Sequence, residues 1–121
     1  MSLTVTVTSK LARGGKAEIL AVPYGPALPA AVKEALRARA YKGDWGTADL
    51  IVAPQPSPVP FVGVMGLGRN GNSSRRAEAL RRGLGKIIAD ARAHALKVVA
   101  IDISGEKDVE TLARAAVEAA S

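Results

Sequence analysis

The chain has 121 residues, a net charge of +6 and no cysteine, and these facts exclude several classes of protein. A chain of this length makes one domain, residues 1–121, that can bury a core without disulfide bonds. The lack of cysteine excludes a disulfide scaffold, a thiolate zinc site and a cysteine nucleophile. The single histidine, His94, leaves little for a histidine metal site or a Ser-His-Asp triad. Because 3% of the residues are aromatic, a stacking platform for single-stranded nucleic acid is not expected.

Hydrophobic periodicity predicts five strands and three helices. Apolar residues alternate with threonine at 3–8, as in a half-buried strand, whereas the segment 61–65 is apolar on both faces and is expected to be covered on both. In chain order we expect strands at 3–8 and 17–22, a helix at 30–40, strands at 48–53 and 61–65, a helix from Ser73 or Ser74 to about Ala95, a strand at 97–103, and a last helix that starts around 106–110. Gly43 is expected to end the first helix, and Ser73 or Ser74 to cap the second.

This order of elements predicts an α/β sandwich with a largely buried sheet. Two pairs of strands follow each other without a helix between them, so a mixed sheet is expected rather than a purely parallel one. A membrane-spanning helix needs about 20 apolar residues in a row, and no stretch approaches that length. The N-terminus shows no signal-peptide pattern, so a cytoplasmic location is expected.

A glycine-rich turn, Gly66-Leu67-Gly68-Arg69-Asn70-Gly71, joins the strand at 61–65 to the longest helix. Backbone N–H groups of Gly66, Gly68, Arg69 and Gly71 are candidates for binding a phosphate at a helix N-terminus. A dinucleotide site would need an acid about 20 residues further on, where the sequence has alanine. We therefore interpret the motif as a tight turn that requires a positive φ, and phosphate binding is the alternative.

The basic charge gathers in one segment, since residues 69–97 hold eight basic and two acidic residues. Arg75, Arg82 and Lys86 share one face of the predicted helix, opposite its apolar side. We interpret this face as solvated, and a surface that follows nucleic-acid phosphates is the alternative.

The remaining polar residues predict neither a catalytic nor a metal site. Asp44 and Asp49 are close in sequence but have no histidine or third acid beside them, and loop solvation is the expected role. His94 is expected to be solvated at the end of the long helix. Trp45 is expected to cover the edge of the core.

Two segments resemble the N-terminal domain of the leucyl (cytosol) aminopeptidase family. Residues 41–46, Tyr-Lys-Gly-Asp-Trp-Gly, are similar to a stretch written F-K-G-K-x-G, and residues 62–69 are similar to V-x-x-V-G-L-G-K. The arginine- and alanine-rich helix and the strand near 98–101 continue the same order. The resemblance implies a three-layer α/β/α sandwich with a mixed, mostly parallel sheet, related to macro domains.

The resemblance also implies a function for the parent protein. Family members release N-terminal amino acids from peptides by means of two divalent metal ions, zinc or manganese. A separate C-terminal domain carries the metal ligands in a signature that this sequence lacks, and the family assembles as hexamers. We therefore expect this chain to be a fragment of such a protein, with an architectural role, no cofactor of its own and the catalytic domain as partner.

The alternative is a freestanding binding module for nucleic acid or an ADP-ribose-like nucleotide. Some members of the family bind DNA, and the macro-like fold suggests ADP-ribose by analogy alone. Proteins that bind ADP-ribose use an acid near the first strand-to-helix turn, but residues 23–26 contain none. Asn70 and Asn72 only partly imitate the asparagine-rich motif of those proteins.

Overall fold

A computed structural model of the chain describes residues 4–8, 17–68 and 71–120. The backbone forms the strands β1 (Thr4–Thr8), β2 (Ile19–Pro23), β3 (Ala48–Val52), β4 (Phe61–Met65) and β5 (Val98–Asp102), and the helices α1 (Ala30–Ala38), α2 (Ser73–Ala93) and α3 (Val109–Ala120). Every predicted element is present, with ends that differ by a few residues from the expected ones.

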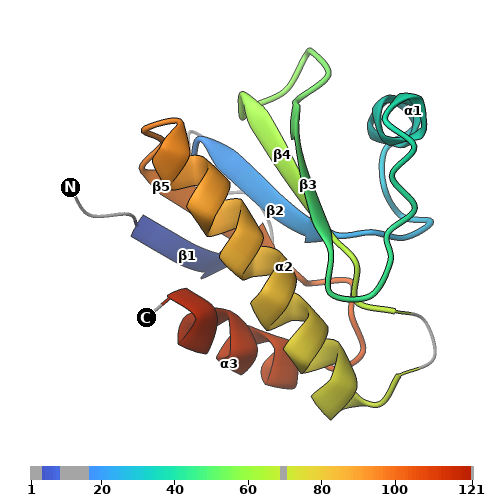
Figure 1. The fold of residues 1–121 in the computed structure, drawn as a ribbon, viewed down its shortest axis with the longest axis vertical. Helices are drawn as coiled ribbons and strands as arrows, with labels where there is room; N and C mark the ends of the chain where they lie inside the picture. Colours follow the sequence, from blue (N-terminus) through green and yellow to red (C-terminus); the bar gives the residue numbers. More distant parts are fainter. Residues whose placement is uncertain (1–3, 9–16, 69–70, 121) are drawn as a thin grey trace.

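The strands form one mixed sheet in the order β1-β5-β2-β4-β3 (Figure 1). The pairs β1–β5, β5–β2 and β2–β4 are parallel, and β3 pairs with β4 in the antiparallel sense. The predicted mixed and mostly parallel sheet is therefore confirmed. β3 and β4 are neighbours in the sheet, and the connection 53–60 returns the chain directly from the end of one to the start of the other, which makes this pair antiparallel. The other pair of strands predicted to follow each other without a helix, β1 and β2, is not antiparallel, because both strands pair in parallel with β5, which lies between them.

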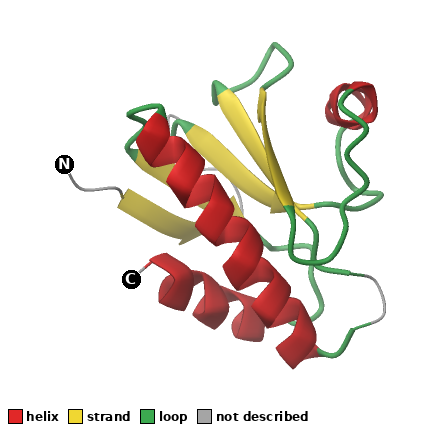
Figure 2. Ribbon diagram, viewed as in Figure 1, coloured by secondary structure: helices red, strands yellow, loops and turns green. Residues whose placement is uncertain are grey.

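Helices pack on both faces of the sheet. Figure 2 shows α2 across the sheet and α1 apart from it, on the side of β3 and β4. α2 and α3 lie side by side over one face, where Leu80, Leu84 and Leu112 are fully buried. α1 covers the other face with Val32 and Leu36, which pack in one cluster with apolar residues of β3 and β4. These layers confirm the predicted α/β sandwich.

β4 lies inside the sheet and is covered on both faces, as its continuous apolar sequence predicts. Val62 and Val64 belong to the cluster on the α1 face, whereas Met65 belongs to the cluster under α2. Between them, a Cβ on Gly63 would come within 2.8 Å of Ile87 Cδ1 on α2. A glycine at this position lets α2 approach the sheet closely.

Two predictions about helix ends are wrong. The side chain of Asn72, not of Ser73 or Ser74, caps α2, and its Oδ1 accepts a hydrogen bond from the backbone N–H of Arg75 at 2.9 Å. The first helix ends at Ala38, and Ala40 takes the left-handed conformation there with a φ of 58°. Gly43 also has a positive φ, but it lies in the turn after the helix and does not end it.

Candidate functional site

The glycine-rich turn after β4 packs against the loop before β3. Gly66 donates its backbone N–H to the Thr47 carbonyl at 2.8 Å, and its own carbonyl accepts from Gly46 N–H at 2.8 Å. A Cβ on Gly66 would overlap the backbone oxygen of Asp44. Only glycine therefore allows the two loops to lie this close.

The second glycine of the turn needs its special backbone conformation. Gly68 has a φ of 80°, and a Cβ there would lie 3.2 Å from Trp45 Cδ1. This agrees with the interpretation of the motif as a tight turn. Arg69, the cationic candidate of the motif, lies outside the described residues. Gly71 precedes the α2 cap, close to the Arg75 side chain. Phosphate binding by this turn stays a prediction.

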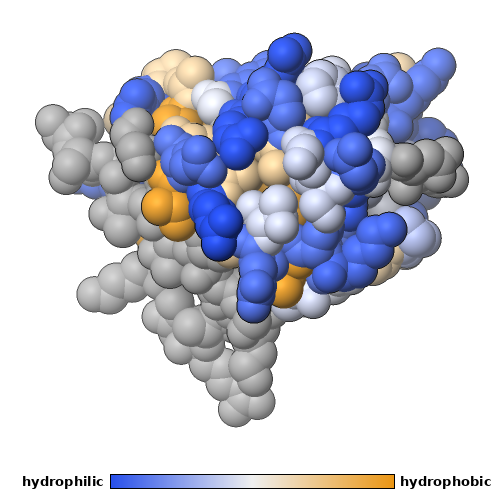
Figure 3. Space-filling model, turned by 90° about the horizontal axis from the view of Figure 1, so that it is seen from below, coloured by the Kyte–Doolittle hydropathy of each residue, from blue (hydrophilic) through white to orange (hydrophobic). Residues whose placement is uncertain are grey.

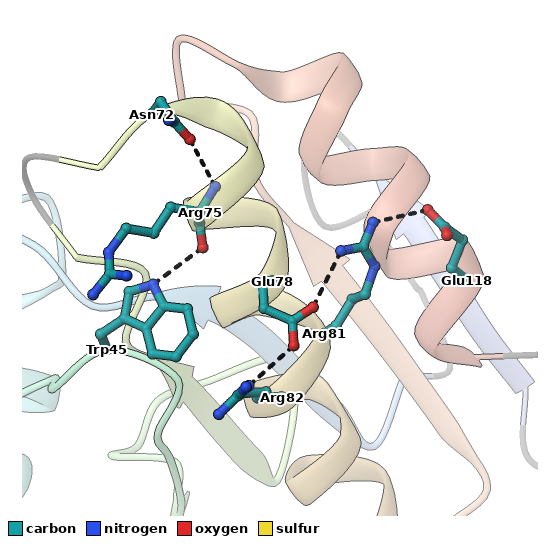
Figure 4. Close-up of polar contacts among 7 residues, drawn as sticks. All are labelled: Trp45, Asn72, Arg75, Glu78, Arg81, Arg82 and Glu118. Atoms are coloured by element: carbon teal, nitrogen blue, oxygen red, sulfur yellow. Dashed lines mark hydrogen bonds and ion pairs between the residues drawn. The ribbon is translucent and has the colours of Figure 1, made fainter.

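The predicted basic face of α2 makes contacts within the chain through Trp45 (Figure 4). The guanidinium carbon of Arg75 lies 4.7 Å from the centroid of the indole ring, and that of Arg82 lies 4.9 Å from it. The indole Nε1 donates a hydrogen bond to the Arg75 carbonyl at 3.1 Å. Cation–π contacts of this kind stabilise by about 0.5–1 kcal/mol each at exposed sites. They hold the loop before β3 against the first half of α2.

The third residue of the predicted face, Lys86, also makes a contact within the chain, although not with Trp45. Lys86 Nζ donates a hydrogen bond to the backbone oxygen of Ala48 at 2.9 Å, at the start of β3. Arg75, Arg82 and Lys86 thus all contact the segment 45–48. Sequence reasoning places the three on one face but misses the partner, because the contacted residues of the segment 45–48 lie 30 to 38 residues away along the chain. Nucleic-acid binding by this face stays a prediction.

Ion pairs extend this network from α2 to α3 (Figure 4). Glu78 pairs with Arg82 at 3.0 Å and with Arg81 at 3.3 Å, and Arg81 reaches Glu118 on α3 at 3.2 Å. The hydrogen bond from Arg82 lowers the pKa of the Glu78 carboxyl below its ordinary value, and Arg81 adds to this effect. These side chains are exposed, so water and salt screen the pairs and each contributes little to stability.

The underside of the molecule is largely polar in the part that the structure describes. Figure 3 views the molecule from below and shows mainly hydrophilic residues, with small hydrophobic areas between them. His94 lies at the far end of α2, where its Nδ1 contacts the Asp90 carbonyl at 2.8 Å. The expectation of loop solvation is wrong for Asp49. It lies on β3 with a side chain that is 13% exposed, and Arg39 donates hydrogen bonds to its two carboxylate oxygens at 2.7 and 2.8 Å.

These contacts define a small α/β sandwich domain whose charged side chains hold its own helices and loops together. The sequence matches the cytosol aminopeptidase family, N-terminal domain, over residues 13–121. The chain belongs to this family, as the motifs at 41–46 and 62–69 predict. A comparison with curated proteins gives no match. In the part of the chain that the structure describes, no helix has both the length and the apolar character needed to cross a membrane.

The family motif at 41–46 includes the half-buried Tyr41. Titration of its hydroxyl should lower the free energy of unfolding at alkaline pH. Burial raises the pKa of the Tyr41 hydroxyl above its ordinary value, and its hydrogen bond with Thr47 only partly opposes this. The folded domain therefore holds this proton more tightly than the unfolded chain. Its contribution is fully present below the unfolded pKa of about 10 and is lost as the pH rises through the folded value.

We expect Tyr41→Phe to reduce the alkaline loss of stability. Urea unfolding of both proteins, from about pH 8 to about pH 11, measures the difference between their free energies of unfolding. This difference should be constant up to about pH 9.5 and then shift in favour of Tyr41→Phe. Lysine titration affects both proteins alike and cancels. A difference that stays constant over the whole range would show that the Tyr41 hydroxyl titrates equally in both states.

Proposed function

We propose that this chain is the non-catalytic N-terminal domain of a leucyl aminopeptidase-like metallopeptidase of the cytoplasm, with an architectural and assembly role. The parent protein would release N-terminal amino acids from peptides and would assemble as a hexamer. Membership of the family over residues 13–121 is the observation that carries the proposal. In this view the domain packs against the catalytic domain and sets how the subunits associate.

The contacts that the carboxylates make within the chain support a structural role for the domain. Glu18 Oε1 accepts hydrogen bonds from the backbone N–H groups of Lys97 and Val98, and Asp102 Oδ1 accepts from Ser104. Six further acidic residues form ion pairs with arginine, namely Glu34, Asp49, Glu78, Glu106, Asp108 and Glu118. These eight carboxylates bind the chain to itself and point to stabilisation of the fold rather than to hydrolysis.

The two metal ions of the parent do not fit the residues described here. A dinuclear hydrolytic site needs several carboxylates that converge on two ions about 3.5–4 Å apart. Within the described residues, no three His, Asp or Glu side chains lie close enough to hold one metal ion. We therefore assign the zinc or manganese ions to the catalytic domain and derive no catalytic step through them in this chain.

The proposal predicts that the chain alone neither hydrolyses leucine p-nitroanilide with added zinc or manganese nor holds metal after purification. In the parent protein, deletion of this domain should change the assembly, measured by size-exclusion chromatography with light scattering. Turnover by the purified chain, or two tightly bound metals per chain, would contradict the non-catalytic role. A parent protein that assembles identically without the domain would contradict the architectural role.

A further inference from the structure

A pocket of about 500 Å³ lies between α1 and the loop that follows β2. This volume is within the range of sites that bind small molecules. The pocket is lined by Tyr24, Lys33, Leu36, Arg37, Tyr41 and Lys42, among others. All of these residues belong to the described part of the chain, and none contributes to the contacts between α2 and Trp45.

The pocket is positively charged. Apart from the two tyrosines, each ionisable residue among the described lining residues is a cation. Arg37 pairs with Glu34 at 3.5 Å, but both side chains are at least three-quarters exposed and the pair is weak. Lys33 and Lys42 form no ion pair with any described residue. An anion in the pocket would therefore meet three cations that the fold does not firmly neutralise.

Two aromatic rings stand beside these cations in a fixed arrangement. The rings of Tyr24 and Tyr41 have centroids 5.7 Å apart and meet edge to face at 81°. A Cβ on Gly43 would overlap the Tyr24 ring, so the backbone of Gly43 packs directly on that ring. Tyr24 remains 36% exposed, whereas the neighbouring Leu36 is almost fully buried. The pocket thus offers an aromatic surface, packed against Tyr41 and the backbone of Gly43, next to its cationic side chains.

The place of the pocket in the fold also suits a ligand. Tyr24 directly follows β2, and its backbone N–H donates to the Met65 carbonyl at the end of β4, at 2.7 Å. β2 leads to α1 on one face of the sheet, and β4 leads to α2 on the other. Open α/β sheets bind their ligands outside the carboxyl ends of strands, where consecutive connections diverge to opposite faces.

We propose that this pocket binds a phosphate monoester that carries an aromatic or apolar group. The cations Lys33, Arg37 and Lys42 hold the phosphate by charge-assisted contacts. The ring of Tyr24 contacts the organic part. The absence of carboxylates from the described lining disfavours amines and metal ions, since these ligands need negative charge.

Isothermal titration calorimetry of the chain with phenyl phosphate tests this site, with inorganic phosphate and phenol as comparison ligands. Phenyl phosphate should bind with a measurable affinity that falls as salt is added, because salt screens charge contacts. The double variant Lys33→Gln/Lys42→Gln should lose at least about tenfold in affinity. The matched control Lys97→Gln/Lys107→Gln removes the same charge from exposed positions outside the pocket and should lose less than about twofold.

The variant Tyr24→Leu tests the contact with the organic group of the ligand separately from the contacts with its phosphate. It should weaken phenyl phosphate and leave inorganic phosphate unchanged, because only the ester has a group that contacts the ring. Equal losses in the two lysine double variants would overturn the site, as would a lack of saturable binding. Inorganic phosphate that binds as tightly as phenyl phosphate would overturn the assignment to a monoester. Circular dichroism of each variant ensures that only folded protein is compared.

Discussion

Replacement of Val64 by aspartate is expected to unfold the domain at neutral pH. Val64 lies in the middle of β4, has no exposed surface and packs among the apolar residues between the sheet and α1. A carboxylate there would lose its hydration without gaining an ion pair, which costs several kcal/mol. A domain of this size has a total stability of about 5–15 kcal/mol. Far-ultraviolet circular dichroism and urea unfolding would detect the loss.

Val52→Asp is the matched control for this experiment. It introduces the same side chain at a valine of the neighbouring strand β3, where the residue is 72% exposed. The charge stays hydrated there, so the variant should remain folded and lose at most about 1 kcal/mol of strand preference. A Val64→Asp protein with the same urea midpoint as Val52→Asp would show that β4 is not covered on the α1 face.

Local sequence patterns predict most of the fold. The apolar run at 61–65 identifies a buried strand, because every side chain of such a strand must be covered on one face or the other. The short connection between β3 and β4 favours their antiparallel pairing, but the same reasoning fails for β1 and β2, which both pair in parallel with β5. These features depend on residues that are neighbours in the sequence, and their periodicity is visible without knowledge of the fold.

Contacts between distant segments are the part that the sequence does not predict. The spacing of Arg75 and Arg82 shows that they share a helix face, but it does not reveal that Trp45 covers that face. The cap of α2 shows a smaller error of the same kind, since Asn72 and Ser73 have similar capping preferences and the path of the preceding loop decides between them. The pocket beside Tyr24 likewise exists only because α1 folds back toward the end of β2.

The buried ion pairs of Arg76 also join segments that are distant in the sequence. We expect the domain to lose much of its stability when these pairs are broken. Arg76 lies on α2 and is 7% exposed. Its Nη1 pairs with Asp108 at 3.0 Å, and its Nη2 pairs with Glu106, both in the segment before α3. Arg76→Met keeps most of the side-chain volume but leaves two carboxylates without their cation. Removal of one partner from a buried pair costs about 3–5 kcal/mol.

The surroundings of Asp108 decide how much stability the Arg76→Met variant should lose within this range. Its side chain is only 6% exposed and its Oδ2 has no hydrogen-bond partner among the described residues, so it suffers most from the loss of Arg76. Its position directly before α3 moderates the loss, because the N-terminal end of a helix stabilises negative charge by about 0.3–1 kcal/mol. Glu106 is 25% exposed and can regain some hydration. We therefore expect a loss near 3 kcal/mol, measured by urea unfolding.

Two further variants separate the ion pairs from packing. Arg37→Met removes an exposed arginine whose pair with Glu34 is open to water, and it should cost less than about 1 kcal/mol. Addition of Glu106→Gln and Asp108→Asn to Arg76→Met removes the unpaired charges and should recover at least half of the loss, because neutral amides are less costly to bury than carboxylates. If Arg76→Met costs no more than Arg37→Met, or if the triple variant recovers nothing, then packing between α2 and α3 stabilises this end of the domain without help from charge.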